Sequence, residues 1–287
     1  MMCHDMMDES AKDEGSPVNS GLSEGRLAMI QIEHLSKIFK LNKKQQKELK
    51  TKETTKKAVD DLSLEIHDGE IFGLLGTNGA GKTTTLRCMA TLLKPSEGHI
   101  TINGADTVSD SEKVRRNIGF LTNEIKMDPQ FSADYLFSFF GRLRNLPEET
   151  ITARKRELFD YFGITEFKDK KIEELSSGMK QKVSIAVSLI HNPEIIIFDE
   201  PTTGLDIITA KAVVDYLIKL KAEGKTIIIS THIMSEAQKL CDRIAMIING
   251  RLVACGTLSE LLEETGGADL EEAFFDYYKK HSGEVIG

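Results

Sequence analysis

A short apolar strand that runs into a glycine-rich loop and then into a helix is the feature that most constrains this chain. Residues 71–76, IFGLLG, have the character of a strand. Residues 76–83, GTNGAGKT, fit the pattern GxxxxGK[ST], and residues 82–93 have helical spacing. The glycines let backbone N–H groups turn inward around a phosphate, and the helix directs the positive end of its dipole there. In this setting the pattern predicts a nucleoside triphosphate site, and not an accidental glycine turn.

The residue types within the loop indicate separate roles. Lys82 is expected to reach the β and γ phosphates, and the Thr83 hydroxyl is expected to bind Mg²⁺. The residues predicted to contact the nucleotide are Gly76, Thr77, Asn78, Gly79, Ala80, Gly81, Lys82, Thr83 and Thr84. The loop therefore supplies both the phosphate contacts and one ligand of the predicted metal.

Acidic residues and a histidine follow two later apolar strands. The run EIIIFDEP ends in Asp199 and Glu200, at the place where P-loop ATPases carry a metal-bridging carboxylate and a base for water. Asp199 is assigned to Mg²⁺ through water, and Glu200 to orienting and deprotonating the attacking water. TIIISTH places His232 at a strand end, where its imidazole can hold the water and the base in line. The alternative is that the two acids are merely exposed at a strand end and that the histidine is structural. The phosphate loop in the same chain favours the catalytic roles.

Composition narrows the class of protein. The chain has 287 residues, 40% of them hydrophobic, which suits one large domain or two small ones. The net charge of −8 argues against a nucleic-acid binder, and no apolar run approaches the roughly 20 residues of a membrane span. The four cysteines lack the paired spacing of a zinc site. Residues 1–28 are acidic and rich in Ser and Gly, without the pattern of a secretory signal, and are predicted to be a disordered tail.

Four motifs in a fixed order carry a resemblance to a known family. The phosphate loop is followed by LSSGMKQK at residues 175–182, then by IIIFDEPTTGLD and ISTH. From about Met29 to its C-terminus the chain resembles the ATP-binding subunit of an ABC transporter. The second motif separates this family from small P-loop kinases and GTPases. The resemblance implies an α/β fold, a RecA-like P-loop core with an antiparallel β subdomain and an inserted α-helical subdomain.

The resemblance also implies how the chain is divided. The ATP-binding core is expected over residues 29–123 and 185–256, and the helical subdomain with LSSGMKQK over 124–184. Amphipathic segments such as SADYLFSFFGRL support a helical reading of the insert. Residues 257–287 are expected to form a C-terminal helical extension.

In this family two ATP-binding subunits hold ATP between them. The resemblance implies that Ser176 and Gly178 donate hydrogen bonds to the γ phosphate bound by a second copy, and that Asp206 lies in a dimer-contact loop. Phe39 falls where the family stacks an aromatic ring on adenine, with a core aromatic as the alternative. The implied cofactors are ATP and Mg²⁺. The implied partners are a second subunit, most simply identical, and an integral membrane permease, at the cytoplasmic face of the cell membrane.

Three departures from the family pattern stand out. In LSSGMKQK, Ser177 replaces a usual glycine and Met179 a usual glutamine. Asn123 takes the place of a glutamine that in this family senses Mg²⁺ and the membrane partner. We therefore expect Asn123 to have a catalytic and metal-binding role, either alone or shared with Glu124. Residues 40–57 are a lysine-rich insertion, with eight lysines and two glutamates. Five of these lysines recur at helical spacing, which is the pattern of one basic helical face: Lys40, Lys43, Lys44, Lys47 and Lys50. We favour a solvated hairpin extension over a contact with anionic lipid or an acidic partner loop.

Further resemblances concern the substrate. The SSGM signature, FDEPTTGLD and the C-terminal stretch DLEEAFFDYYKK resemble ABC exporters whose ATPase and membrane domain are separate chains. Residues 118–143 are most similar to the ATPases of bacterial sodium-extrusion exporters. An exporter of a drug or another small molecule is the first alternative. A soluble ABC-type ATPase acting on a macromolecule is another, although such proteins carry two nucleotide domains or a long coiled coil. Glu200 and His232 together argue against a protein that only holds ATP.

Overall fold

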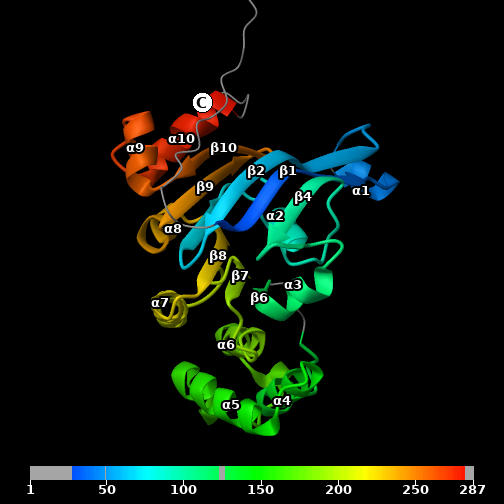
Figure 1. Ribbon diagram of the computed structural model, residues 1–287, viewed down its shortest axis with the longest axis vertical. Coiled ribbons are helices and arrows are strands. Elements are labelled where there is room, and N and C mark those ends of the chain that lie inside the picture. The colour runs from blue at the N-terminus through cyan, green and yellow to red at the C-terminus, as the bar shows by residue number, and fades with distance from the viewer. Residues whose placement is uncertain (1–27, 49, 123–126, 282–287) are drawn as a thin grey trace, which may run out of the picture.

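The computed structural model describes residues 28–48, 50–122 and 127–281, which form two sheets and their covering helices (Figure 1). The smaller sheet is antiparallel and has four strands in the order β2-β1-β4-β5. Its strands are β1 (Ala28–Lys40), β2 (Thr55–His67), β4 (Glu97–Ile102) and β5 (Ala105–Asp106).

The larger sheet has six strands in the order β10-β9-β3-β8-β7-β6, and all its pairs except β9–β10 are parallel. Its strands are β3 (Ile71–Leu75), β6 (Ile118–Leu121), β7 (Ile195–Asp199), β8 (Thr226–Thr231), β9 (Arg243–Ile248) and β10 (Arg251–Gly256). Every residue of β3, β7 and β8 is buried, which explains their near-continuous aliphatic sequences. Because these strands are parallel, their carboxyl ends meet at one edge of the sheet.

Helices cover both faces of this sheet and extend beyond it (Figure 1). Successive residues of β7 point to opposite sides: Ile195 and Ile197 join a core shared with the antiparallel sheet and α2, and Ile196 and Phe198 join a core shared with α4 to α7. The helices are α2 (Lys82–Met89), α3 (Ser111–Asn117), α4 (Ala133–Leu143), α5 (Glu148–Phe162), α6 (Ser177–Ser188), α7 (Ile207–Ala222), α8 (Met234–Leu240), α9 (Leu258–Thr265) and α10 (Leu270–His281), with short 3₁₀ turns at Ile164–Glu166 and Ile172–Glu174.

This architecture confirms the predicted fold class, a P-loop α/β core with an antiparallel β subdomain and added helices. The helices α4 and α5 lie at the end of the molecule away from β1 and β2 (Figure 1). Helix α6 runs across residue 184, where we placed the end of the helical subdomain. The subdomain boundaries therefore remain an assignment from the family resemblance.

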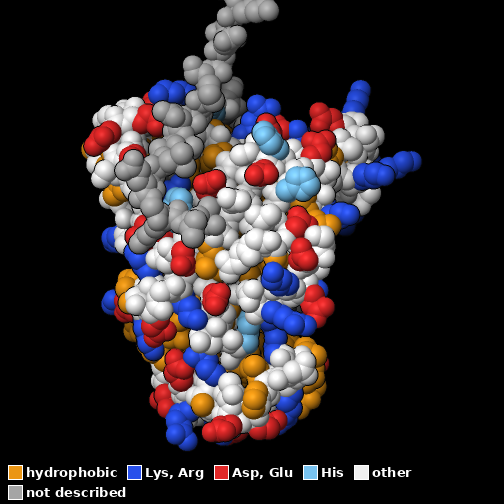
Figure 2. All heavy atoms as spheres, in the orientation of Figure 1, with side chains coloured by type: hydrophobic (Ala, Val, Ile, Leu, Met, Phe, Trp, Pro, Cys, Tyr) orange, Lys and Arg blue, Asp and Glu red, His pale blue; other side chains and the backbone are white. Residues whose placement is uncertain are grey.

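The lysine-rich insertion continues the β1–β2 hairpin. Lys40 pairs with Thr55, and the Leu41 N–H donates to the Thr54 carbonyl at 2.8 Å, so pairing extends past Phe39. The connection holds a short helix, α1 (Lys43–Glu48), which includes only part of the set of lysines with helical spacing. In Figure 2 Lys and Arg side chains project from this end of the molecule. The hairpin extension agrees with the interpretation that we favoured.

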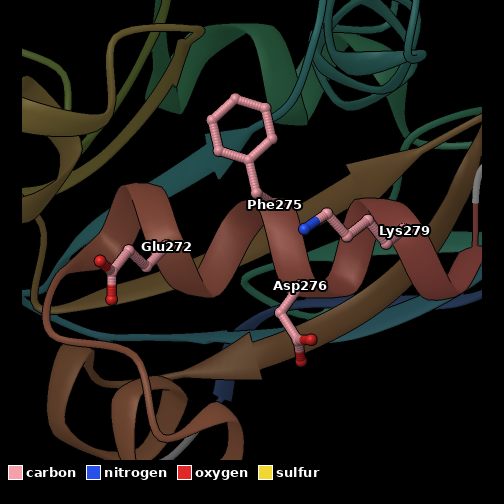
Figure 3. Close-up of a pocket in the computed structure, with 4 residues that line it drawn as sticks. All are labelled: Glu272, Phe275, Asp276 and Lys279. Atoms are coloured by element: carbon pink, nitrogen blue, oxygen red, sulfur yellow. The ribbon is translucent and has the colours of Figure 1, made fainter. Parts of the chain in front are cut away.

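The C-terminal helices α9 and α10 pack on β9 and β10 through a separate apolar cluster that includes Phe274 and Tyr277. The other face of α10 carries Phe275, which is partly exposed among the charged residues Glu272, Asp276 and Lys279 (Figure 3). In the described ranges, no helix has both the length and the apolar character needed to cross a bilayer.

Candidate active site

The phosphate loop connects the buried end of β3 to the first turn of α2, as predicted. Gly76 and Gly81 are required by close packing: an added Cβ would lie 2.4 Å from the Ile247 carbonyl oxygen at Gly76 and 2.5 Å from the Ala58 carbonyl oxygen at Gly81. Gly81 also has a φ of 111°, a value that other residues rarely adopt. The loop therefore has the tight, side-chain-free backbone that a phosphate cradle needs.

Lys82 is buried inside this loop, with 4% of its surface exposed. Its Nζ donates to the carbonyl oxygens of Gly76 at 2.7 Å and Thr77 at 3.1 Å, and it lies 3.8 Å from Glu200 Oε1. Burial lowers the pKa of the Lys82 ammonium, and the charges of Glu200 and Asp199 act against that shift. The cation is thus placed where the loop backbone would meet a phosphate.

Asp199, the last residue of β7, has a buried carboxylate held by two hydroxyl groups. Thr83 Oγ1 donates to Asp199 Oδ1 at 3.1 Å, and Ser230 Oγ donates to the same oxygen at 2.5 Å. Ser230 had not been selected from the sequence. The signal that reveals it is the parallel register of β7 and β8, in which Asp199 and Ser230 are partners.

Glu200, His232 and Thr203 form a hydrogen-bonded group at the same sheet edge. His232 Nδ1 lies 3.0 Å from Glu200 Oε1, and Thr203 Oγ1 donates to Glu200 Oε2 at 3.2 Å. Glu200 has a φ of 50°, and its N–H donates to the Ser230 carbonyl and hydroxyl oxygens. Left-handed backbone at a residue other than glycine persists where the surroundings fix it, often at functional sites. Ser230 thereby holds the Glu200 backbone, and His232 and Thr203 hold its carboxylate.

Phe39 and the phosphate loop line one cavity of about 250 Å³. The Phe39 ring is partly buried, and the Lys37 ammonium lies 5.3 Å from its centroid. The full lining consists of Phe39, Lys56, Ala58, Asn78, Gly79, Gly81, Lys82, Thr83, Thr84 and Glu200. The structure therefore brings the predicted adenine platform, the loop and the predicted base together, and it adds Lys56, which sequence reasoning had not placed at the site.

The second motif lies at the start of α6, outside the lining of this cavity. Ser176 caps α6 by accepting from the Met179 N–H, and Asp206 caps α7 by accepting from the Ile208 and Thr209 N–H groups. Gly178 brings the two helix starts together: an added Cβ would lie 3.3 Å from Thr209 Oγ1 and 3.4 Å from Asp206 Oδ2. None of Ser176, Gly178 and Asp206 is among the described residues that line the cavity.

Gln181 connects the second motif to the active-site region, whereas Asn123 lies outside the described residues. Gln181 Nε2 on α6 donates to the Pro201 carbonyl at 3.1 Å, which ties the second motif to the loop that follows Glu200. Asn123, with Glu124 beside it, lies outside the described residues, so its predicted role stays a prediction.

Comparisons with known proteins agree with this geometry. The ABC transporter family profile matches residues 59–203. The ABC transporter ATP-binding protein NatA of Bacillus subtilis (strain 168) is 45% identical over 219 residues, which cover 76% of this chain and 89% of NatA. The daunorubicin resistance ATP-binding protein DrrA3 of Streptomyces coeruleorubidus is 40% identical over 74% of this chain and 67% of its own length.

A solved structure extends the comparison to three dimensions. The dimeric ATP-binding cassette MJ0796, in a post-hydrolysis state with ADP and Pi, superposes with a TM-score of 0.70 at 28% identity. The match covers 80% of this chain and 98% of the cassette. Three observations agree on the family: a P-loop core with a buried lysine, paired acids at a strand end, and a family profile that matches half of the sequence. The chain belongs to the ABC transporter family, as an ATP-binding and ATP-hydrolysing subunit.

Proposed function

We propose that this chain powers an ABC exporter by hydrolysing Mg·ATP between two copies of itself beneath a membrane permease. The observation that carries the proposal is the convergence of Lys82, Asp199 and Glu200 at one sheet edge, with Ser176 and Gly178 outside the lining of that cavity. Because this one chain carries both the catalytic base and the second motif, we favour a dimer of two identical subunits. Such a dimer has two-fold symmetry, so each copy lends its second motif to the nucleotide of the other.

The residues at Asp199 fit a magnesium ion. A threonine hydroxyl and a carboxylate oxygen meet at 3.1 Å, and Mg²⁺ takes one or two such oxygen ligands together with phosphate oxygens and water. Thr83 and Asp199 would hold the ion, with Asn123 proposed beside them. The ion supplies charge neutralisation on the phosphates when it is bound.

The protein groups would then act on the water that attacks the γ phosphate. Glu200 would orient this water and accept its proton, since its carboxylate is fixed at the rim of the cavity and faces the Lys82 ammonium. His232 would hold the Glu200 carboxylate in line through the 3.0 Å contact. Loss of the γ phosphate removes the charge-assisted hydrogen bonds that join the copies, so hydrolysis would separate them.

Substitution of Gly178 tests the trans contact. In Gly178→Glu the new side chain would crowd Asp206 Oδ2 and place a second negative charge beside it, where the γ phosphate of the other copy is proposed to bind. We expect ATPase activity to fall at least about a hundredfold, as when a transition-state donor is removed. Binding of ATP to the monomer should stay unchanged. Thr150→Glu, which adds the same charge at an exposed position of α5, is the control. Equal losses in both variants would contradict the assignment.

An apolar groove along α4 suits a permease. It has a volume of about 520 Å³ and lies between α4, α6 and β6. Four exposed apolar side chains at four-residue spacing form the α4 stripe: three lie on one face of α4, and the fourth precedes the helix and stacks on Tyr135. They are Phe131, Tyr135, Phe139 and Leu143. Figure 2 shows hydrophobic side chains gathered at this end of the molecule. A contiguous exposed apolar patch is typical of a protein interface.

Substitutions on the α4 stripe test this contact. Phe139→Asp should reduce co-purification with the permease at least about tenfold, because a charge would be buried in an apolar interface. ATP binding by the isolated chain should not change. Phe275→Asp, at an equally exposed phenylalanine on α10, is the matched control and should bind the permease normally. Normal co-purification of the Phe139 variant would place the permease elsewhere.

For the substrate we propose Na⁺, supported by the resemblance of residues 118–143 to sodium-exporter ATPases. The name of DrrA3 makes a drug the second candidate, and the name concerns that protein alone. The test is ATP-driven flux in vesicles that contain this chain and a membrane protein from a neighbouring reading frame. Na⁺ movement that stops in Glu200→Gln supports the proposal. Transport of a drug without transport of Na⁺ would contradict Na⁺ and make the drug the substrate.

A further inference from the structure

Lys56 is a charged residue of the nucleotide cavity that no motif of the chain includes. It lies within the lysine-rich insertion, yet it lines the same cavity as Phe39, Thr83 and Thr84. It is also the register partner of Phe39 across the β1–β2 pair. Directly opposed residues of an antiparallel pair have Cβ atoms about 4.5–5.5 Å apart on one face. The side chain of Lys56 therefore starts beside the ring that is proposed to stack on adenine.

We infer that Lys56 is a nucleotide-binding residue whose ammonium contacts the phosphate nearest the ribose, an inference that rests on the proposed function. Ala58, two residues further along β2, lines the same cavity and has its carbonyl against Gly81 at the start of α2. Two strand residues span about 6.6 Å, so the flexible lysine side chain can bridge from the level of Phe39 to the phosphate end of the cavity.

The chemistry of lysine favours a phosphate as its ligand. An ammonium has three donors and no acceptor, so it complements an anionic oxygen and cannot accept from the amino group of adenine. No described carboxylate forms an ion pair with Lys56, whereas its neighbour Lys57 pairs with Asp60. Lys56 is exposed and is free to turn toward the cavity.

The rest of the insertion holds Phe39 and Lys56 in place. Beyond this pair the ladder continues to Thr55, and α1 closes it through reciprocal bonds of Asn42 and Gln45, each 2.9 Å long. Gln46 Nε2 donates to the Glu53 carbonyl at 2.9 Å, which joins α1 to the segment that leads into β2. The insertion is thus a braced extension, and a short turn at Phe39 would lack this bracing.

Charge substitutions at Lys56 test the inference by titration with ATP and GTP at low and high salt. Because the contact is partly exposed, Lys56→Gln should weaken ATP binding by about two- to fivefold and Lys56→Glu by about tenfold. Lys56→Arg should bind as the wild type does. Losses should be equal for ATP and GTP, since the contact is to phosphate, and should shrink at high salt. Lys47→Glu, which makes the same change on α1 outside the cavity, should have no effect.

Lys82→Ala, measured in parallel, separates two kinds of failure. Wild-type affinity in Lys56→Glu, together with lost binding in Lys82→Ala, would overturn the inference and leave the proposed function standing. Unequal effects on ATP and GTP would assign Lys56 to the base and overturn the phosphate contact. Unchanged binding in Lys82→Ala would instead contradict the proposed function itself.

Discussion

Glu200→Gln is expected to bind ATP as the wild type does and to hydrolyse it at least about a hundredfold more slowly, the usual contribution of a positioned base. Glutamine has the same shape but cannot accept the proton of the attacking water at neutral pH. The backbone at residue 200 is held by Ser230, so the substitution should leave the loop in place. With ATP bound and not hydrolysed, the two copies should remain together as a dimer.

Single-turnover hydrolysis and light scattering with Mg·ATP measure both effects. Glu194→Gln is the matched control, because Glu194 immediately precedes the same strand that Glu200 follows. The control should turn over normally and should not accumulate dimer. A Glu200→Gln protein that hydrolysed ATP at the wild-type rate would falsify the assignment of the base.

Lys82→Ala should act on an earlier step, the binding of ATP itself. The lysine is buried among the carbonyl groups of the loop, so its removal leaves a phosphate without its charge-assisted partner. Such bonds contribute about 1.5–3 kcal/mol each, which corresponds to a loss of affinity of about 10- to 100-fold. Thermal stability without nucleotide should change little, because the removed charge was itself costly to bury.

Equilibrium titration with a fluorescent ATP analogue measures this loss. Lys211→Ala, which removes an exposed lysine of α7, is the control for a general effect of charge. ATP affinity in Lys82→Ala equal to that of the wild type would mean that the loop does not hold the phosphates.

The parts of the site that follow from local sequence were predictable. The glycine loop must join a strand to a helix, and Asp199, Glu200 and His232 follow buried strands, so parallel pairing brings them together. The fold class followed from the family resemblance of the motifs and their order. These features depend on backbone rules that act over short stretches of chain.

The residues that escaped prediction depend on register between distant segments. Ser230 contacts Asp199 only because β7 and β8 pair in one register, and Lys56 reaches the cavity only because it opposes Phe39. The lysine spacing in the insertion suggested a helical face from Lys40 to Lys50, but Lys40 is paired in β1 and the helix α1 spans only Lys43–Glu48. Tertiary pairing overrides local periodicity in such segments, and a single sequence does not reveal the pairing.

The most direct test of the central claim, ATP hydrolysis at sites shared by two copies, mixes two inactive variants. A dimer of Gly178→Glu with Glu200→Gln has one site with an intact base from the first copy and an intact second motif from the other. When the variants are mixed before ATP is added and pair at random, half of the dimers are mixed, so the initial ATPase rate should recover to about a quarter of the wild-type value. Each variant alone should stay inactive. A mixture as inactive as its components would contradict the shared site.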